Sequence, residues 1–202
     1  MLHLKGVDWV SHPVNLLKAE NYTPWYLGIN PRGLVPTLVH NGDVQIESNG
    51  IISYLDETFT TPRLIPDDQK LHVQAHLQDE DGLHFDLRTL AFGFVLPRFL
   101  AGKPPEALDA LEAAEGHVEG QPNDHKYAQL AFWRGLAQHG IPPEQATASA
   151  NRFKAAFTDL EKQRADQPYL FGGSLSAFDI AWFIYAHRLI STGYPFMRLI
   201  PA

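Results

Sequence analysis

The segment from Asn30 to Tyr54, NPRGLVPTLVHNGDVQIESNGIISY, constrains the fold more than any other part of the chain. Its Asn41-Gly42 pair favours positive φ at both residues, and it separates two short apolar runs. We therefore predict an antiparallel hairpin in which residues 38–40 pair with residues 44–46. Pro36 stands near the start of the first strand, which we expect over residues 34–39 and which is a position where a strand tolerates proline.

The same segment predicts a turn before the hairpin and a helix after it. Residues 30–33 have the composition of a turn. Residues 47–49 end the second strand and start a helix, whose buried stripe comprises Ile51, Ile52 and Leu55. Ser48 then lies at a helix N-terminus, where free N–H groups and the helix dipole favour a carboxylate or a phosphate. The segment therefore indicates a site for a small anionic molecule.

This ordered set of features resembles the glutathione-binding half of the glutathione S-transferase superfamily, which is a thioredoxin-like domain. The resemblance implies that the peptide bond before Pro36 is cis and that the main chain of Val35 pairs with the cysteinyl part of glutathione. It also implies that Glu47 and Ser48 hold the γ-glutamyl end. Arg32 stays open between a partner for the glycine-end carboxylate and a turn residue. In the plainer interpretation, Pro36 only marks an edge strand and Ser48 only caps a helix. That interpretation explains each feature by itself but not their occurrence together in this order.

Composition excludes several other functions. The net charge of −7 and the pI near 5.7 argue against a nucleic-acid partner, because such binding depends on clustered Lys and Arg. The chain has no cysteine, which excludes disulfides, thiolate metal sites and thiol redox chemistry within it. Its longest uncharged apolar runs, residues 89–97 and 180–187, fall short of the roughly 20 residues that span a bilayer. MLHLKGVDW lacks a secretory pattern, so we expect a cytoplasmic protein with no membrane partner.

Beyond the hairpin the pattern becomes helical. Residues 60–68 carry two prolines without periodicity and are typical of a linker, which predicts a thioredoxin-like domain over residues 1–60 and an all-helical domain over residues 67–202. We expect no second hairpin. The expected helices are one long helix over 69–100, or two joined near Gly82, a short one within 103–123, and others over 124–139 and 143–164.

Two further stretches refine the resemblance. Ser176 and Asp179 have the spacing of a capping box, with Leu175 and Ile180 as its hydrophobic staple. This resembles the capping box in the helical domain of glutathione transferases, so its implied role is folding. The segment over residues 125–143 is similar to bacterial β-etherase-type transferases, which use the glutathione thiolate to cleave aryl-ether bonds.

Two groups of side chains could bind other partners. His84, Phe85 and Arg88, with Phe92 and Phe94, fall on a helix that in transferases borders the pocket for the electrophile. An aromatic wall with one guanidinium would suit a flat aryl substrate that carries an acidic group, although core packing explains the same residues equally well. His72, His76 and Glu80 share one helix face, but this spacing is more typical of a solvated face than of a metal site, and we predict no metal.

The resemblance also implies parts that lie outside the chain. Superfamily members open with a strand and a loop whose Ser, Tyr or Cys activates the glutathione sulfur, whereas Met1 to Trp9 resembles the end of the following helix. We therefore expect further residues before Met1. Relatives usually continue through another helix beyond the position of Ala202. Ser11 is interpreted as a loop residue, so no catalytic residue is named.

The expected function follows from these parts. A homodimer would transfer the glutathione thiolate to an electrophilic carbon of a hydrophobic or aryl substrate, and cleavage of a β-aryl ether is one form of this reaction. The alternative is a non-catalytic binding or scaffold protein of the same fold, which the absence of the activating segment favours. Glutathione is the co-substrate in the first interpretation and the ligand in the second.

Overall fold

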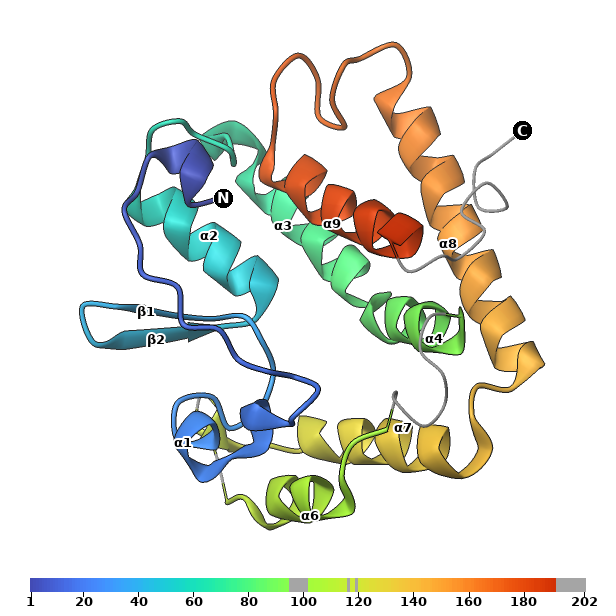
Figure 1. Cartoon of the computed structure of the whole chain (residues 1–202). Coiled ribbons are helices and arrows are strands. Elements are labelled where there is room, and N and C mark those ends of the chain that lie inside the picture. The colour runs from blue at the N-terminus through green and yellow to red at the C-terminus, as the bar shows by residue number, and fades with distance from the viewer. Residues whose placement is uncertain (95–101, 116, 119, 192–202) are drawn as a thin grey trace. The chain divides into compact units, whose positions relative to one another are not determined.

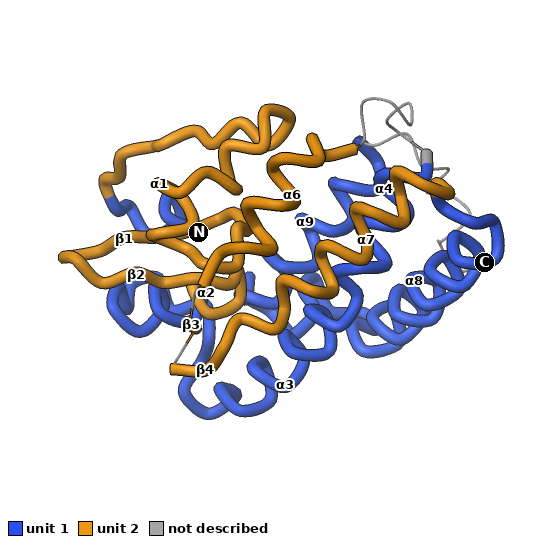
Figure 2. Tube along the Cα trace, turned by 90° about the horizontal axis from the view of Figure 1, so that it is seen from below, with its two compact units in different colours: residues 1–7, 52–96, 141–202 blue, residues 8–51, 97–140 orange. Residues whose placement is uncertain are grey.

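A computed structural model describes residues 1–94, 102–115, 117–118 and 120–191. The chain packs into two units (Figure 2). The first comprises residues 1–7, 52–96 and 141–202, and the second comprises residues 8–51 and 97–140. Each unit is therefore built from segments that lie far apart in the sequence.

The first unit is helical. Helix α9 packs against α3 and α4, and α4 packs against α8 (Figure 1). The helices of this unit are most of α2 (Ser48–Thr58), α3 (Lys70–Asp81), α4 (His84–Phe94), α8 (Pro143–Arg164) and α9 (Ala177–Ser191), with 3₁₀ turns at His3–Lys5 and Asp67–Gln69. Val73, Leu90, Phe153 and Leu189 are fully enclosed at its centre. The core thus forms where the apolar stripes of these helices meet.

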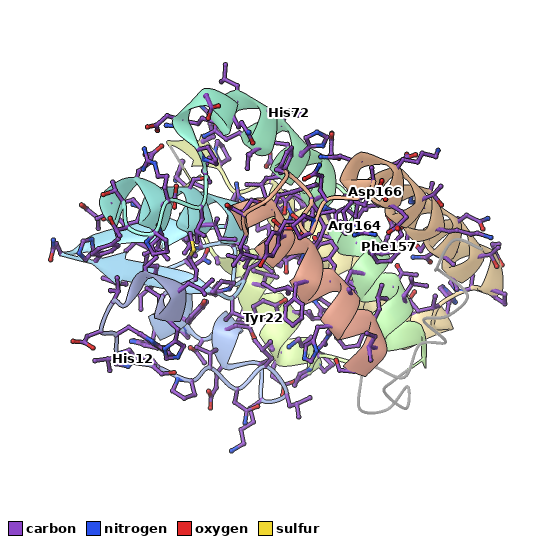
Figure 3. All side chains as sticks on the ribbon, turned by 90° about the horizontal axis from the view of Figure 1, so that it is seen from above. His12, Tyr22, His72, Phe157, Arg164 and Asp166 are labelled. Carbon is purple, nitrogen blue, oxygen red and sulfur yellow. The ribbon has the colours of Figure 1, made fainter. Side chains whose placement is uncertain are left out.

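The predicted helices of this unit agree closely with the structure. Of the two alternatives for residues 69–100, two helices form, and they separate at Gly82 and Leu83. The predicted end near Leu100 lies outside the described residues. Helix α8 has the predicted bounds, and its Phe153 faces the core while Phe157, labelled in Figure 3, packs beside it with ring centroids 5.9 Å apart.

The predicted capping box is present at the start of α9. The Ser176 N–H donates to Asp179 Oδ2 at 2.8 Å, and the Asp179 N–H donates in return to Ser176 Oγ at 3.3 Å. Asp179 Oδ1 also accepts from the Leu170 N–H at 2.8 Å, so the box holds the preceding loop as well as the helix. Two of the orphan donors at this helix end are satisfied in this way.

A buried ion pair joins the chain's first residues to the end of α2. Lys5 Nζ lies 2.6 Å from Asp56 Oδ1, and their side chains are only 1% and 2% exposed. The Asp56 carboxylate also accepts from the N–H groups of Leu64 and Ile65, at 2.8 and 3.0 Å. Lys5 Nζ donates in addition to the carbonyls of Phe59 and Pro62. Both charges are therefore surrounded by polar partners, which buried charges require.

The second unit holds the hairpin. Strands β1 (Thr37–His40) and β2 (Asp43–Ile46) form the predicted antiparallel hairpin, with Leu38 opposite Gln45 and Val39 opposite Val44. Asn41 and Gly42 have φ values of 54° and 92°, as the predicted tight turn requires. The first strand begins at Thr37 and not at Leu34, so residues 34–36 form an irregular segment before it.

The rest of this unit is mainly helical. Helix α6 packs against α7 and against the 3₁₀ turn at Glu20–Tyr22. Its elements are α1 (Pro24–Leu27), α6 (Pro105–Ala113), α7 (His125–His139), and the strands β3 (His117–Val118) and β4 (Gln121–Pro122). The β3–β4 pair contradicts the expectation that no second hairpin forms. Strands of two residues are too short to show a sequence period, so only the turn at Gly120, with φ of 75°, could have indicated them.

Candidate functional site

The site begins with the turn at residues 30–33. The Gly33 N–H donates to the Asn30 carbonyl at 2.9 Å, and the Arg32 N–H donates to Asn30 Oδ1 at 3.0 Å. Asn30 is fully buried, so its side chain fixes the turn from inside. Gly33 has φ of 61°, and a Cβ there would lie 2.7 Å from the ring of Tyr22. Both its backbone conformation and this close approach require glycine.

Four consecutive carbonyls, those of residues 31–34, accept hydrogen bonds from buried or partly buried side chains of the same unit. Asn123 Nδ2 donates to the Pro31 carbonyl at 2.7 Å, and Gln129 Nε2 donates to that of Arg32 at 2.8 Å. Asn21 Nδ2 donates to the Gly33 carbonyl at 2.6 Å. The Leu34 carbonyl accepts from Tyr26 Oη and from Asn30 Nδ2, at 2.6 and 2.9 Å. The loop is thus held along its length.

Two further contacts secure these donors. Tyr26 Oη lies 2.8 Å from Thr37 Oγ1, which connects the loop to the first residue of β1. Burial raises the pKa of the Tyr26 phenol, so the group stays protonated and can donate to the loop. Tyr22, which is buried and labelled in Figure 3, donates from its hydroxyl to Gln129 Oε1 at 3.3 Å.

Val35 follows this row of anchored carbonyls directly. Its side chain is 40% exposed, and its peptide bond to Pro36 is cis, as the resemblance implies. Within the described part of the chain, neither its N–H nor its carbonyl makes a hydrogen bond. The main chain of Val35 can therefore pair with an extended peptide, in the manner of an added strand.

Helix α2 begins beside the end of the hairpin. The helix starts at Ser48, and the Ile51 N–H donates to the Glu47 carbonyl at 2.9 Å. Ser48 is exposed at this end, as predicted. Glu47 has φ of 65°, in the left-handed region that few residues other than glycine adopt. Such outliers concentrate at functional sites.

An ion pair connects the turn to this helix start. Arg32 Nη1 lies 2.6 Å from Glu47 Oε1, and the two side chains are 26% and 34% exposed. The contact lacks the angles of a hydrogen bond. Arg32 Nε and Glu47 Oε1 are consequently without a hydrogen-bonding partner among the described residues. The structure therefore brings Arg32 to Glu47, next to Ser48.

The residues predicted to contact an electrophile lie on α4 in the first unit. Arg88 Nη2 is 3.3 Å from His84 Nε2, and the Arg88 guanidinium carbon lies 5.3 Å from the centroid of the Phe85 ring. Such a cation–π contact combines an aromatic surface with a positive charge. Phe92 lies on the same helix, whereas the side chain of Phe94 falls outside those the structure describes.

Helix α3 carries the histidine pair that was considered as a metal site. His72, labelled in Figure 3, has its Nε2 atom 3.0 Å from that of His76. Glu80 is buried and hydrogen-bonds to Tyr185, whose phenol pKa is raised by burial and by this carboxylate. Across the described ranges, no three His, Cys, Asp or Glu residues are grouped as a metal ion would need. In the same ranges, no helix has the length and apolar character of a membrane span.

Sequence reasoning missed the residues that hold the loop at residues 31–34, which are Asn21, Tyr26, Asn30, Asn123 and Gln129. Asn30 was recognised only as part of a turn. Gln129 lies on the buried face of α7, where a polar residue at an apolar position is the one sequence signal that could have identified it. The binding roles of Val35, Pro36, Glu47 and Ser48 stay predictions, as do those of Arg32, His84, Phe85 and Arg88.

Comparison with known proteins identifies the family. The sequence profile of the "Glutathione S-transferase, N-terminal domain" matches residues 1–58, and that of the "Glutathione S-transferase, C-terminal domain" matches residues 143–202. The chain is 48% identical over 74 residues to a zeta-class glutathione S-transferase of Euphorbia esula, covering 37% of this chain and 32% of that protein. It is 46% identical over 70 residues to the maleylacetoacetate isomerase of Pseudomonas aeruginosa, covering 33% of each. These matches span about a third of the length of those relatives.

One relative is similar along almost the whole chain. Protein LigF of Sphingobium sp. strain SYK-6 is 29% identical over 198 residues, which cover 95% of this chain and 73% of LigF. The crystal structure of β-etherase LigF superposes with a TM-score of 0.79 over 99% of this chain and 81% of that one, at 25% identity. The fold is accordingly a thioredoxin-like α/β domain followed by a helical domain. The chain belongs to the glutathione S-transferase superfamily.

Proposed function

We propose that this chain binds glutathione and transfers its thiolate to an electrophilic carbon of an aryl substrate, with cleavage of a β-aryl ether as the specific reaction. The observation that carries the proposal is the unpartnered main chain of Val35, which follows an anchored loop. The likeness to LigF supports the ether substrate, because that protein is named a β-etherase.

Each part of glutathione has a proposed partner in the second unit. The cysteinyl residue pairs with the Val35 N–H and carbonyl as an added antiparallel strand, beside Pro36. The γ-glutamyl ammonium binds the Glu47 carboxylate. The γ-glutamyl carboxylate accepts from the hydroxyl and N–H of Ser48, where the α2 dipole is favourable to an anion. Main-chain pairing and charge recognition together would orient the sulfur.

The proposed reaction is a substitution at carbon. The glutathione sulfur attacks the carbon that carries the aryloxy group, so that a C–S bond forms as the C–O bond breaks. The aryloxide leaves with the electron pair and then takes up a proton. For the electrophile we propose contacts with His84, Phe85 and Arg88, because an aromatic ring under a guanidinium suits a flat aryl group with an acidic substituent.

Three broader expectations belong to the same proposal. We propose a homodimer, which the superfamily resemblance implies, and a cytoplasmic location. We also propose that the domain division lies between residues 60 and 67. Gel filtration with light scattering would test the dimer, and limited proteolysis would test the division, because an exposed linker is cleaved before packed domains are.

The test is a turnover assay with two electrophiles. The folded chain is incubated with glutathione and either a nitroaryl halide or a ketone that carries an aryloxy group on the carbon next to its carbonyl, and thioether and phenol are quantified. With the aryl ether, release of phenol in amounts equal to thioether supports the proposal; with the nitroaryl halide, the thioether forms with release of halide and reports general transferase activity. Glutathione sulfonate, which lacks a nucleophilic thiol, is the matched control and should give no product.

Two results would contradict the proposal in different ways. Glutathione binding without turnover of either electrophile would favour the non-catalytic binding protein. No glutathione binding by a folded protein would show that the site at Val35 and Ser48 is assigned wrongly. In an active sample, the rate should rise with pH as the glutathione thiol ionises, because attack requires the thiolate.

A further inference from the structure

The ion pair between Arg32 and Glu47 lies at the proposed γ-glutamyl site. We propose that the two side chains together bind the whole α-amino-acid head of that group, with Glu47 taking the ammonium and Arg32 taking the α-carboxylate alongside Ser48. Arg32 would then be a specificity-determining residue for ligands with a free amino-acid terminus. This inference rests on the proposed function and extends it.

The main chain of Arg32 is fixed at both of its polar groups. Its N–H donates to Asn30 Oδ1 at 3.0 Å, and its carbonyl accepts from Gln129 Nε2 at 2.8 Å. Asn30 and Gln129 are both fully buried. The turn therefore presents the Arg32 side chain from a fixed point, and only the side chain can adjust to a ligand.

The pair has unused hydrogen-bonding capacity. Arg32 Nε and Glu47 Oε1 are shielded from solvent and have no hydrogen-bonding partner among the described residues. Unsatisfied polar atoms are rare because each costs free energy, and they commonly indicate a missing partner. Here both belong to a single ion pair, whose side chains remain partly exposed. A ligand that brings one donor and one acceptor would satisfy both.

The opposite charges of Arg32 and Glu47 favour a ligand that carries both an ammonium and a carboxylate. An α-amino-acid head carries an ammonium and a carboxylate on one carbon, so it can lie antiparallel to the guanidinium and carboxylate of the pair. Each of the four charges then has two opposite neighbours. A ligand without the ammonium would leave its carboxylate and Glu47 to share the single positive charge of Arg32, which disfavours binding. The geometry therefore suits zwitterionic heads and disfavours simple dicarboxylates.

The test uses titration calorimetry to measure the affinity of the wild type and of two Arg32 variants for each of three ligands. Arg32→Met removes the charge and keeps the length of the side chain, while Arg32→Lys keeps a charge. The ligands are glutathione, 4-aminobutyryl-Cys-Gly, which lacks the α-carboxylate, and glutaryl-Cys-Gly, which lacks the ammonium. Arg134→Met is the matched control, because Arg134 pairs with Glu112 on the surface of the same unit at 2.7 Å.

The expected pattern is selective. Arg32→Met should weaken glutathione roughly 10-fold or more, the size of a lost charge-assisted hydrogen bond, and should leave 4-aminobutyryl-Cys-Gly within about twofold. Arg32→Lys should recover part of the glutathione affinity, and glutaryl-Cys-Gly should bind more weakly than glutathione to the wild type. Arg134→Met should change none of the affinities.

Other outcomes would overturn the inference. Equal weakening of glutathione and 4-aminobutyryl-Cys-Gly by Arg32→Met would mean that Arg32 acts only through the shape of the loop. A gain in affinity would mean that Arg32 competes with the ammonium for Glu47. Melting curves for each variant show whether it is folded. If the folded wild type binds neither glutathione nor 4-aminobutyryl-Cys-Gly, the proposed function itself fails, and the inference fails with it.

Discussion

Replacing Asp56 by alanine is expected to be among the most destabilising single changes to the described chain. The Asp56 carboxylate lies 2.6 Å from Lys5 Nζ, with both side chains almost completely buried. Removing one partner of a buried ion pair costs about 3–5 kcal/mol, since the other charge is left uncompensated. The N–H groups of Leu64 and Ile65 also lose their acceptor, at about 1–3 kcal/mol each when unsatisfied.

These contributions do not simply add. Lys5 Nζ keeps the carbonyls of Phe59 and Pro62 at 2.6 and 2.7 Å, which offsets part of the loss. We therefore expect a decrease of about 4 kcal/mol or more in the free energy of unfolding. For a chain of this size, that corresponds to a melting temperature lower by roughly 10 °C.

Urea denaturation followed by circular dichroism measures the effect directly. Asp67→Ala is the matched control, because Asp67 pairs with Arg63 in the same unit but is 81% exposed, and it should cost less than about 1 kcal/mol. Adding Lys5→Met to Asp56→Ala should recover part of the stability by removing the unpaired charge. A loss below about 1 kcal/mol for Asp56→Ala would refute the reasoning, since the carboxylate would then not hold these segments together.

The remaining predictions concern Ser48, the capping box, His76 and Gln129. Ser48→Ala should weaken glutathione roughly 10- to 150-fold, measured by calorimetry, because a charge-assisted hydrogen bond worth about 1.5–3 kcal/mol is lost; equal affinities would contradict the γ-glutamyl assignment. Ser176→Ala and Asp179→Ala should each lower unfolding stability by about 1 kcal/mol or more, and unchanged melting temperatures would show that the box does not stabilise α9. Burial, and then the charge of the neighbouring histidine, lower the pKa of His76 from 6.5, so the unfolded chain binds this proton first as pH falls. Stability should therefore decrease as pH falls below about 6.5, and a His76→Gln variant with the same pH dependence would argue against this cause. Gln129→Met should leave the Arg32 carbonyl unpaired, costing about 1–3 kcal/mol in unfolding experiments and weakening glutathione; a wild-type affinity would show that this contact does not shape the site.

The parts of the fold that sequence predicts well are those set by neighbouring residues. Asn41-Gly42 determines the hairpin because two adjacent residues need positive φ, and Ser176 and Asp179 determine a helix start because they lie three residues apart. Helix α8 was predicted with its observed bounds, since a 22-residue periodic stretch leaves little ambiguity.

The parts that sequence does not predict depend on partners far along the chain. Gln129 reaches the carbonyl of Arg32 across 97 positions, and Asn123 reaches that of Pro31 across 92. An amide side chain has no sequence pattern that names its acceptor. Lys5 and Asp56, 51 positions apart, are equally inconspicuous because single charged residues are usually solvated. Sequence therefore located the candidate site, whereas the contacts that hold its loop required the structure.

The row of hydrogen bonds to residues 31–34 has a consequence for the thermodynamics of binding. Ordering a flexible residue costs about 1–2 kcal/mol in backbone entropy. This loop is already ordered in the folded chain, because side chains donate hydrogen bonds to four successive carbonyls. Ligand binding therefore does not have to order it. A peptide that pairs with Val35 then loses mainly its own conformational freedom, which favours tight binding from few contacts. Buried amide side chains would thus help to set the affinity of a surface that they do not form.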